Sequence, residues 1–128
     1  MSADPPKLPL ILMIDDETAL LEIVQAALEG DGFRVRTAAS PSEGLALYEK
    51  LWREIDLVLL DYLMPEMTGD RVFETLQRIN PDVRVLLLTA CEDRVAHKMF
   101  AAGLRGFLQK PFYLGDVTSR IREIIDAG

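Results

Sequence analysis

Polar residues suited to metal and phosphate chemistry stand at the ends of four apolar runs in this chain. The runs end on Asp15 and Asp16, on Asp61, on Thr89 and on Lys110. Short apolar runs with many branched side chains are typical of strands buried on both faces of a parallel sheet. Because parallel strands place their carboxyl ends on one edge of the sheet, these side chains are predicted to converge there.

The predicted cluster has a definite chemistry. Three carboxylates, from Asp15, Asp16 and Asp61, would repel one another unless a hard divalent cation lay between them, and an open carboxylate site suits Mg²⁺. The cluster offers no nitrogen or sulfur ligand, which disfavours zinc. Lys110 adds a positive charge and Thr89 a hydroxyl, so the pocket suits phosphoryl oxygens. A carboxylate is the group left to receive the phosphoryl, as an aspartyl phosphate.

Strands and helices are predicted to alternate five times. The predicted strands cover residues 10–14, 33–38, 55–60, 83–89 and 106–109, and the predicted helices cover residues 18–29, a segment beginning at residue 41, and residues 70–79, 93–102 and 117–125. This alternation favours right-handed βαβ units, hence a parallel sheet between two layers of helices. The predicted fold class is therefore α/β.

Two of these helices have distinctive patterns. In residues 18–29, Leu20, Val24, Ala27 and Leu28, with Ile23 beside them, recur at helical spacing and predict a buried stripe. Residues 40–43 read Ser-Pro-Ser-Glu, a capping box with proline at the first helical position, so a helix is predicted to begin at residue 41.

Length and composition limit the function classes. The chain of 128 residues is predicted to form one domain, and its net charge of −7 argues against direct nucleic acid binding. The single cysteine, Cys91, allows no internal disulfide and is consistent with a cytoplasmic location. No apolar run approaches a membrane span or a signal peptide. Residues 1–9, with three prolines, are predicted to be a flexible lead, and residues 10–126 the domain.

Four segments together resemble a known family. MIDDE, LLDYLMPEMTG, LLLTA and GFLQKPF are similar, in this order, to the signature segments of the receiver domain of two-component response regulators. The resemblance covers almost the whole chain. It implies a flavodoxin-like (βα)5 sandwich with strand order 2-1-3-4-5. It also implies a signalling domain that takes a phosphoryl group from a histidine kinase or phosphotransfer protein, and promotes its own phosphorylation and dephosphorylation, rather than an enzyme with a separate substrate.

The resemblance also implies metal and phosphoacceptor roles. Asp61 would be the phosphoacceptor and would share the Mg²⁺ ion. Asp16 would bind Mg²⁺ directly, and Asp15 would help to hold it, partly through water. The backbone carbonyl of Leu63 would be a further ligand.

The remaining implied roles concern the phosphoryl group and the response to it. Thr89 and Lys110 would contact the phosphoryl group, and the peptide bond between Lys110 and Pro111 would be cis. Phe107 would be an aromatic switch residue coupled to Thr89, although a core role is an open alternative for Phe107.

Other chemically interesting residues are given structural roles. Glu17 is predicted to be a first-turn helix residue favoured by the helix dipole rather than a metal ligand. His97, the only histidine, is predicted to be structural or exposed, and Cys91 to be an unreactive thiol. Met64 and Met67 are predicted to pack against the core.

Three other functions compete with the phosphorylated receiver. An aspartate-based phosphatase would carry an Asp-x-Asp pattern on its first strand, whereas this strand ends on Asp15 and Asp16. A flavodoxin needs a phosphate-binding loop after that strand, and these acidic residues would repel the phosphate. A receiver that works without phosphorylation stays open, as does the choice between a stand-alone regulator and part of a longer protein with an output domain or target.

Overall fold

One parallel sheet organises the structure, a computed structural model that describes residues 7–90 and 93–128. The strands are β1 (Leu10–Ile14), β2 (Arg34–Ala38), β3 (Ile55–Asp61), β4 (Val85–Thr89) and β5 (Gly106–Gln109). The helices are α1 (Thr18–Gly30), α2 (Pro41–Leu51), α3 (Gly69–Ile79), α4 (Asp93–Ala101) and α5 (Leu114–Asp126). The strand order is β2-β1-β3-β4-β5, which confirms the predicted topology.

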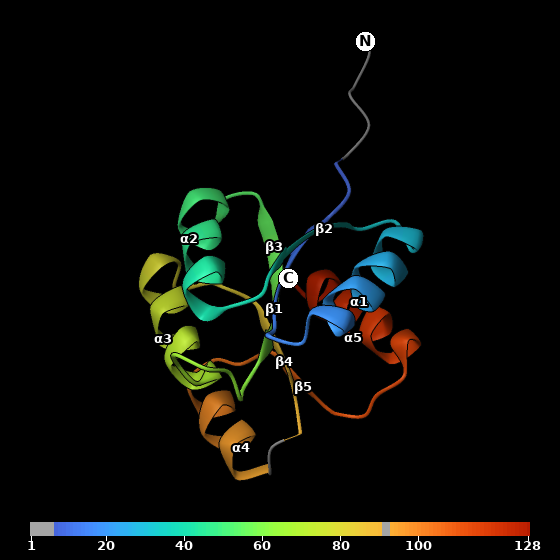
Figure 1. The fold of residues 1–128 in the computed structure, drawn as a ribbon. Helices are drawn as coiled ribbons and strands as arrows, with labels where there is room; N and C mark the ends of the chain where they lie inside the picture. Colours follow the sequence, from blue (N-terminus) through green and yellow to red (C-terminus); the bar gives the residue numbers. More distant parts are fainter. Residues whose placement is uncertain (1–6, 91–92) are drawn as a thin grey trace.

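Helices cover both faces of the sheet. In Figure 1, α2, α3 and α4 lie on one side, and α1 and α5 lie on the other. Each layer closes over its own apolar cluster, one including Tyr48, Val72 and Met99 and the other including Val24 and Ile121. β1 and β4 are buried along their whole length, which explains their unbroken apolar sequences. The predicted (βα)5 sandwich of the flavodoxin-like class is confirmed.

The predicted stripe of α1 is wrong at Ile23 and omits Leu21. Leu21, Val24 and Leu28 are the buried residues of this helix, Leu20 and Ala27 are partly buried, and Ile23 is 53% exposed. The helix is apolar on more than one side, so spacing alone does not choose between neighbouring stripes. Packing against the sheet selects the stripe that contains Leu21.

The start of a helix is predicted correctly where the sequence contains a capping motif. As predicted, α2 begins at Pro41, and Ser40 Oγ accepts a hydrogen bond from the Glu43 backbone N–H at 3.2 Å. By contrast, α5 begins at Leu114, three residues before the predicted start. Its first turn is exposed, so the apolar spacing that begins at Val117 does not mark it.

The segment before β1 is tied to β2 within the described residues. The carbonyl oxygens of Leu8 and Pro9 accept hydrogen bonds from the side chain and the backbone N–H of Arg34, at 2.9 and 2.8 Å. Residues 1–6 lie outside the described residues, so a flexible lead over residues 1–9 stays a prediction. Within the described part of the chain, no helix is long and apolar enough to cross a lipid bilayer.

Candidate functional site

Three carboxylates meet at the carboxyl edge of the sheet. Asp15 and Asp16 follow β1 and Asp61 ends β3, and one oxygen from each lies within 4.8 Å of the others. β1 and β3 are adjacent parallel strands, so their ends lie side by side. Asp15 and Asp61 are buried, at 1% and 5% exposure, whereas Asp16 is exposed. The predicted convergence of the three carboxylates is therefore what the fold produces.

The Asp15 carboxylate is fixed by its own loop. The Asp15 backbone N–H donates to the carbonyl of Ala38 at 3.1 Å, which continues the pairing of β1 with β2. Its Oδ1 accepts a hydrogen bond from the Glu17 backbone N–H at 2.9 Å. These contacts turn the chain out of the strand and leave Oδ2 directed at Lys110.

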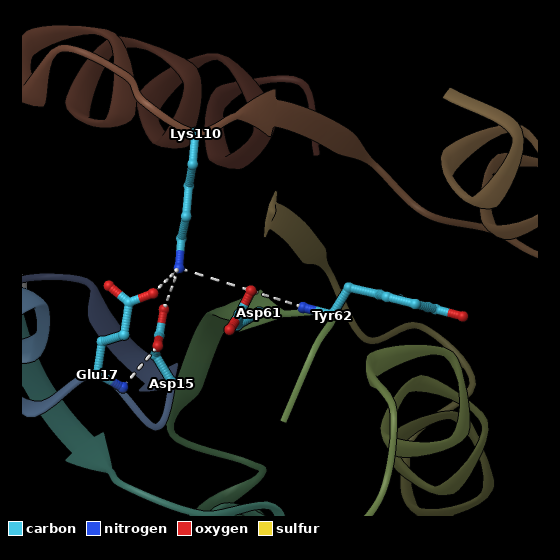
Figure 2. A network of polar contacts seen from close by, with 5 residues as sticks. All are labelled: Asp15, Glu17, Asp61, Tyr62 and Lys110. Carbon is cyan, nitrogen blue, oxygen red and sulfur yellow. Dashed lines mark hydrogen bonds and ion pairs between the residues drawn. The ribbon is translucent and has the colours of Figure 1, made fainter. Parts of the chain in front are cut away.

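Lys110 reaches across the site from the end of β5. Figure 2 shows its ammonium group between the carboxylates of Asp15 and Glu17 on one side and Asp61 on the other. The Nζ atom lies 3.0 Å from Asp15 Oδ2, 3.4 Å from Glu17 Oε1 and 3.6 Å from Asp61 Oδ1. The Lys110 backbone N–H donates to the Thr89 carbonyl at 2.9 Å, and the Lys110–Pro111 peptide bond is cis.

Burial and neighbouring charge raise the pKa of Asp61 to about 6. Burial is the largest cause, and the negative charge of Asp15 acts in the same direction, as does that of Asp16 to a smaller extent. The positive charge of Lys110 and the Tyr62 backbone N–H, which donates to Asp61 Oδ1 at 2.9 Å, act against the rise. The ionised Asp61 is therefore held in an unfavourable environment.

The partners of Asp61 show the same imbalance of charge. Burial raises the pKa of Asp15 although the Glu17 N–H and Lys110 both stabilise its carboxylate. For Lys110, burial lowers the pKa, but the hydrogen bond to Asp15 and the charges of Asp15, Asp61 and Glu17 outweigh burial and raise it. One ammonium group does not balance these carboxylates. An all-oxygen donor set that is open on the Asp16 side fits a hard divalent cation.

The raised pKa of Asp61 predicts a pH-dependent cost to stability. The folded state binds this proton more tightly than the unfolded chain, whose Asp pKa is 3.8. The contribution of protonated Asp61 to the free energy of unfolding is therefore fully present below about pH 4, and it is lost as the pH rises through about 6. At pH 7.5 without divalent cations, Asp61→Asn should raise the free energy of unfolding by about 1–3 kcal/mol.

Urea unfolding in EDTA at pH 7.5 and pH 4 measures this effect. The gain from Asp61→Asn should shrink strongly at pH 4, because the Asp61 of the unmodified chain then also carries no charge. The amide oxygen of asparagine can still accept the Tyr62 N–H, so the variant loses charge rather than its hydrogen bond. An equal gain at both pH values would show that burial does not penalise the ionised Asp61.

The other predicted site residues lie on β4, on β5 and in the loop after β3. Thr89 is buried at the end of β4. Phe107 on β5 is partly buried and packs against the cluster that contains Leu87, its partner in the strand register. Thr89 is two residues beyond Leu87 and therefore lies on the same face of the sheet as Phe107. The Leu63 side chain is 59% exposed.

Some predictions for the residues that were given structural roles are confirmed, and one is wrong. Glu17 precedes the first turn of α1 rather than belonging to it, and its carboxylate contacts Lys110. The predicted place of Glu17 in the first turn is therefore wrong by one position, since it is the N-cap residue, and the prediction that it is not a metal ligand stays a prediction. His97 is exposed and Met64 is buried, as predicted, and Met67 packs against the core. Cys91 lies outside the described residues.

One residue that sequence reasoning did not single out has a role next to Asp61. A Cβ atom placed on Gly69 would lie 2.6 Å from the Asp61 carbonyl oxygen and 2.8 Å from Tyr62 Cα. The Gly69 backbone N–H donates to the Tyr62 carbonyl at 2.7 Å. Gly69 therefore lets α3 begin directly against the backbone of Asp61. The sequence marks this glycine only as a residue suited to a turn, because its close neighbours in space are not visible in the sequence.

The chain is similar to known signalling proteins. Over residues 11–122 it matches the response regulator receiver domain family. It is 33% identical to the sensor kinase CckA of Brucella abortus, over 91% of this chain and 12% of the kinase. It is 36% identical to the probable transcriptional regulatory protein TcrX of Mycobacterium tuberculosis, over 90% of this chain and 49% of that protein.

A solved structure of similar sequence agrees in fold over almost all of both chains. A response regulator receiver domain protein from Clostridium thermocellum is 33% identical, with a TM-score of 0.90, and the match covers 94% of this chain and 96% of that one. By contrast, the chain spans less than half the length of the kinase and of the transcriptional regulator. The sequence match over most of the chain, the shared fold and the aspartate cluster at the sheet edge show that this chain belongs to the response regulator receiver domain family of two-component signalling systems.

Proposed function

We propose that Asp61 is the residue that accepts the phosphoryl group, in a reaction that depends on Mg²⁺. The observation that carries this proposal is the meeting of Asp15, Asp16 and Asp61 at one edge of the sheet, with Lys110 reaching two of them. We propose that the three carboxylates and the backbone carbonyl of Leu63 hold the ion. Metal-dependent phosphorylation of Asp61 by a small donor such as acetyl phosphate is the test.

Asp61 is suited to act as the nucleophile. With a pKa of about 6 it is mostly ionised at pH 7, and its carboxylate lies at the end of a buried strand with little freedom to move. One carboxylate oxygen would form a bond to phosphorus while the bond from phosphorus to the donor atom breaks. That atom is an oxygen that leaves with acetate in acetyl phosphate, or a histidine nitrogen that leaves with the histidine of a protein donor. Bound Mg²⁺ would supply the positive charge that offsets the phosphoryl oxygens.

Lys110 and Thr89 would contact the transferred group. The Lys110 ammonium already lies 3.6 Å from Asp61 Oδ1, so it can reach an oxygen of a group attached there. Thr89 ends β4, the strand next to β3, and its hydroxyl can donate a hydrogen bond to a phosphoryl oxygen. The chain thereby promotes phosphorylation and hydrolysis at its own aspartate, with no separate substrate.

The proposed response to phosphorylation runs from Thr89 to Phe107. Both residues lie on the same face of adjacent strands, and Phe107 packs only partly into the core. Movement of the Thr89 hydroxyl toward a phosphoryl oxygen would open space into which the Phe107 ring can turn. The surface formed by α4 and β5 would then change shape and bias binding to an output domain or target protein.

The proposed donor is a histidine kinase or a histidine phosphotransfer protein that docks beside Lys110. A groove of about 550 Å³ opens there between α1 and the segment after β5. Its lining is mainly apolar: Leu20, Ile23, Ala90, Pro111, Phe112 and Leu114, with Glu17 and Lys110 at the site. Ile23, which packing on the sheet leaves exposed, lines this groove and is available to a partner.

Ile23→Glu should slow phosphoryl transfer from a phosphorylated histidine phosphotransfer protein about tenfold or more. The charge would face an apolar groove, whereas phosphorylation by acetyl phosphate needs no docking and should stay unchanged. Ala26→Glu places the same charge on an exposed position of α1 outside the groove and is the matched control. Unchanged transfer in Ile23→Glu would refute this docking mode.

The extent of the domain and its setting also belong to this proposal. We propose that residues 10–126 form the receiver domain, which is consistent with β1 beginning at Leu10 and α5 ending at Asp126. The curated relatives are longer proteins, so an attached output domain and a separate target are both compatible with this chain. The cytoplasmic location stays a prediction, as does the absence of direct nucleic acid binding.

A further inference from the structure

Glu66 has a backbone conformation that glutamate rarely adopts. Its φ is +75°, and no other residue except glycine has a positive φ among those that the structure describes. In this region Cβ approaches the backbone, so the conformation costs free energy unless contacts around it compensate. Glu66 lies in the loop of residues 62–68, which joins Asp61 at the end of β3 to α3.

The Glu66 side chain supplies such a contact. Its Oε1 accepts hydrogen bonds from the backbone N–H and the Oγ of Ser42, at 3.4 and 3.2 Å, and its Oε2 lies 3.1 Å from the same Oγ. Ser42 is in the first turn of α2, where backbone N–H groups have no partner within the helix. A carboxylate is also favoured there by the helix dipole. The loop is thus fastened to the start of α2.

The same end of α2 is fitted to the strand that carries Asp15. A Cβ atom on Gly44 would lie 2.5 Å from the Ile14 side chain, so the helix backbone packs directly against the residue before Asp15. The carbonyl of Ala38, just before α2, accepts the Asp15 backbone N–H. The first turn of α2 therefore touches both segments that would bind the ion, namely the end of β1 and the loop of residues 62–68.

We propose that Glu66 is a positioning residue for the metal site. Its contact with Ser42 holds the loop so that the Leu63 backbone carbonyl completes the set formed by Asp15, Asp16 and Asp61. The Leu63 side chain is largely exposed and therefore does not fix the position of its own carbonyl. The loop is instead held by residues that follow Leu63 in the chain, through the buried side chain of Met64 and the contact of Glu66 with Ser42. This inference rests on the proposed function, since it concerns the same cation site.

Titration of the purified chain with MgCl2 by calorimetry tests the role of Glu66. Glu66→Gly removes the carboxylate and suits the positive φ, so the thermal midpoint should be unchanged or higher while Mg²⁺ affinity falls about five- to tenfold. Glu66→Gln keeps an oxygen that can accept from Ser42 and should recover most of the affinity. A purely structural role would move stability and affinity together.

Two further variants separate positioning from charge. Glu49→Gln removes one exposed carboxylate of α2 that has no part in the contact, and should change Mg²⁺ affinity less than about twofold. Ser42→Ala should weaken binding in the same direction as Glu66→Gly, and the double variant should be no weaker than Glu66→Gly alone, because both changes break one contact.

The outcomes distinguish the positioning role from the proposed function. Mg²⁺ binding by the unmodified chain with equal affinity in Glu66→Gly would overturn the positioning role and leave the metal site standing. Additive losses in the double variant would also overturn it. Absence of Mg²⁺ binding by the unmodified chain would overturn the proposed function itself, and the positioning role with it.

Discussion

Asp61→Asn is expected to abolish phosphorylation by acetyl phosphate in the presence of MgCl2. An amide oxygen is a poor nucleophile, and the substitution also removes one of the three carboxylates that would hold the ion. Intact-protein mass spectrometry measures the added phosphoryl group directly. The loss should be complete within detection, because no other carboxylate of the described residues lies both in the cluster and at the end of β3.

Asp56→Asn is a matched control for this experiment. It makes the same chemical change on the same strand, but at the opposite end of β3, where the Asp56 carboxylate accepts the Leu10 backbone N–H at 2.8 Å. The asparagine oxygen can still accept that bond, so phosphorylation should continue at the unmodified rate. Undiminished phosphorylation of the Asp61→Asn variant would refute Asp61 as the acceptor.

Asp16→Ala is expected to weaken Mg²⁺ binding by roughly a hundredfold or more and to stop phosphorylation at ordinary Mg²⁺ concentrations. Asp16 is the exposed member of the cluster, so it is the carboxylate through which an ion would enter and which keeps contact with water. Because the side chain is exposed, its loss should change the free energy of unfolding by no more than about 0.5 kcal/mol.

Calorimetric titration with MgCl2 and a thermal melt of the same sample measure the two quantities separately. Asp16→Asn is the conservative comparison, because it keeps an oxygen ligand without the charge and should bind Mg²⁺ with intermediate affinity. Tight Mg²⁺ binding in Asp16→Ala would show that the ion is held elsewhere, and loss of the folded state would show that Asp16 has a structural role.

Much of the fold follows from local sequence patterns. The five alternations of strand and helix are visible because apolar runs end abruptly at charged or turn residues, and because Ser40 and Pro41 mark the start of α2 by their own chemistry. Local patterns do not mark a helix boundary where the chain is exposed. The first three residues of α5 are exposed, so apolar spacing does not reveal its start at Leu114.

The sequence by itself determined the inventory of the site: three acidic residues, a hydroxyl and a lysine, each at the end of an apolar run, so that any parallel sheet brings them to one edge. The tertiary structure decided how these residues interact and which further residues lie beside them. Burial at the sheet edge raises the pKa of Asp61, the turn after Asp15 brings Glu17 to Lys110, and packing on the sheet leaves Ile23 exposed. These features depend on distances between segments far apart in the chain, which residue types and local spacing do not specify.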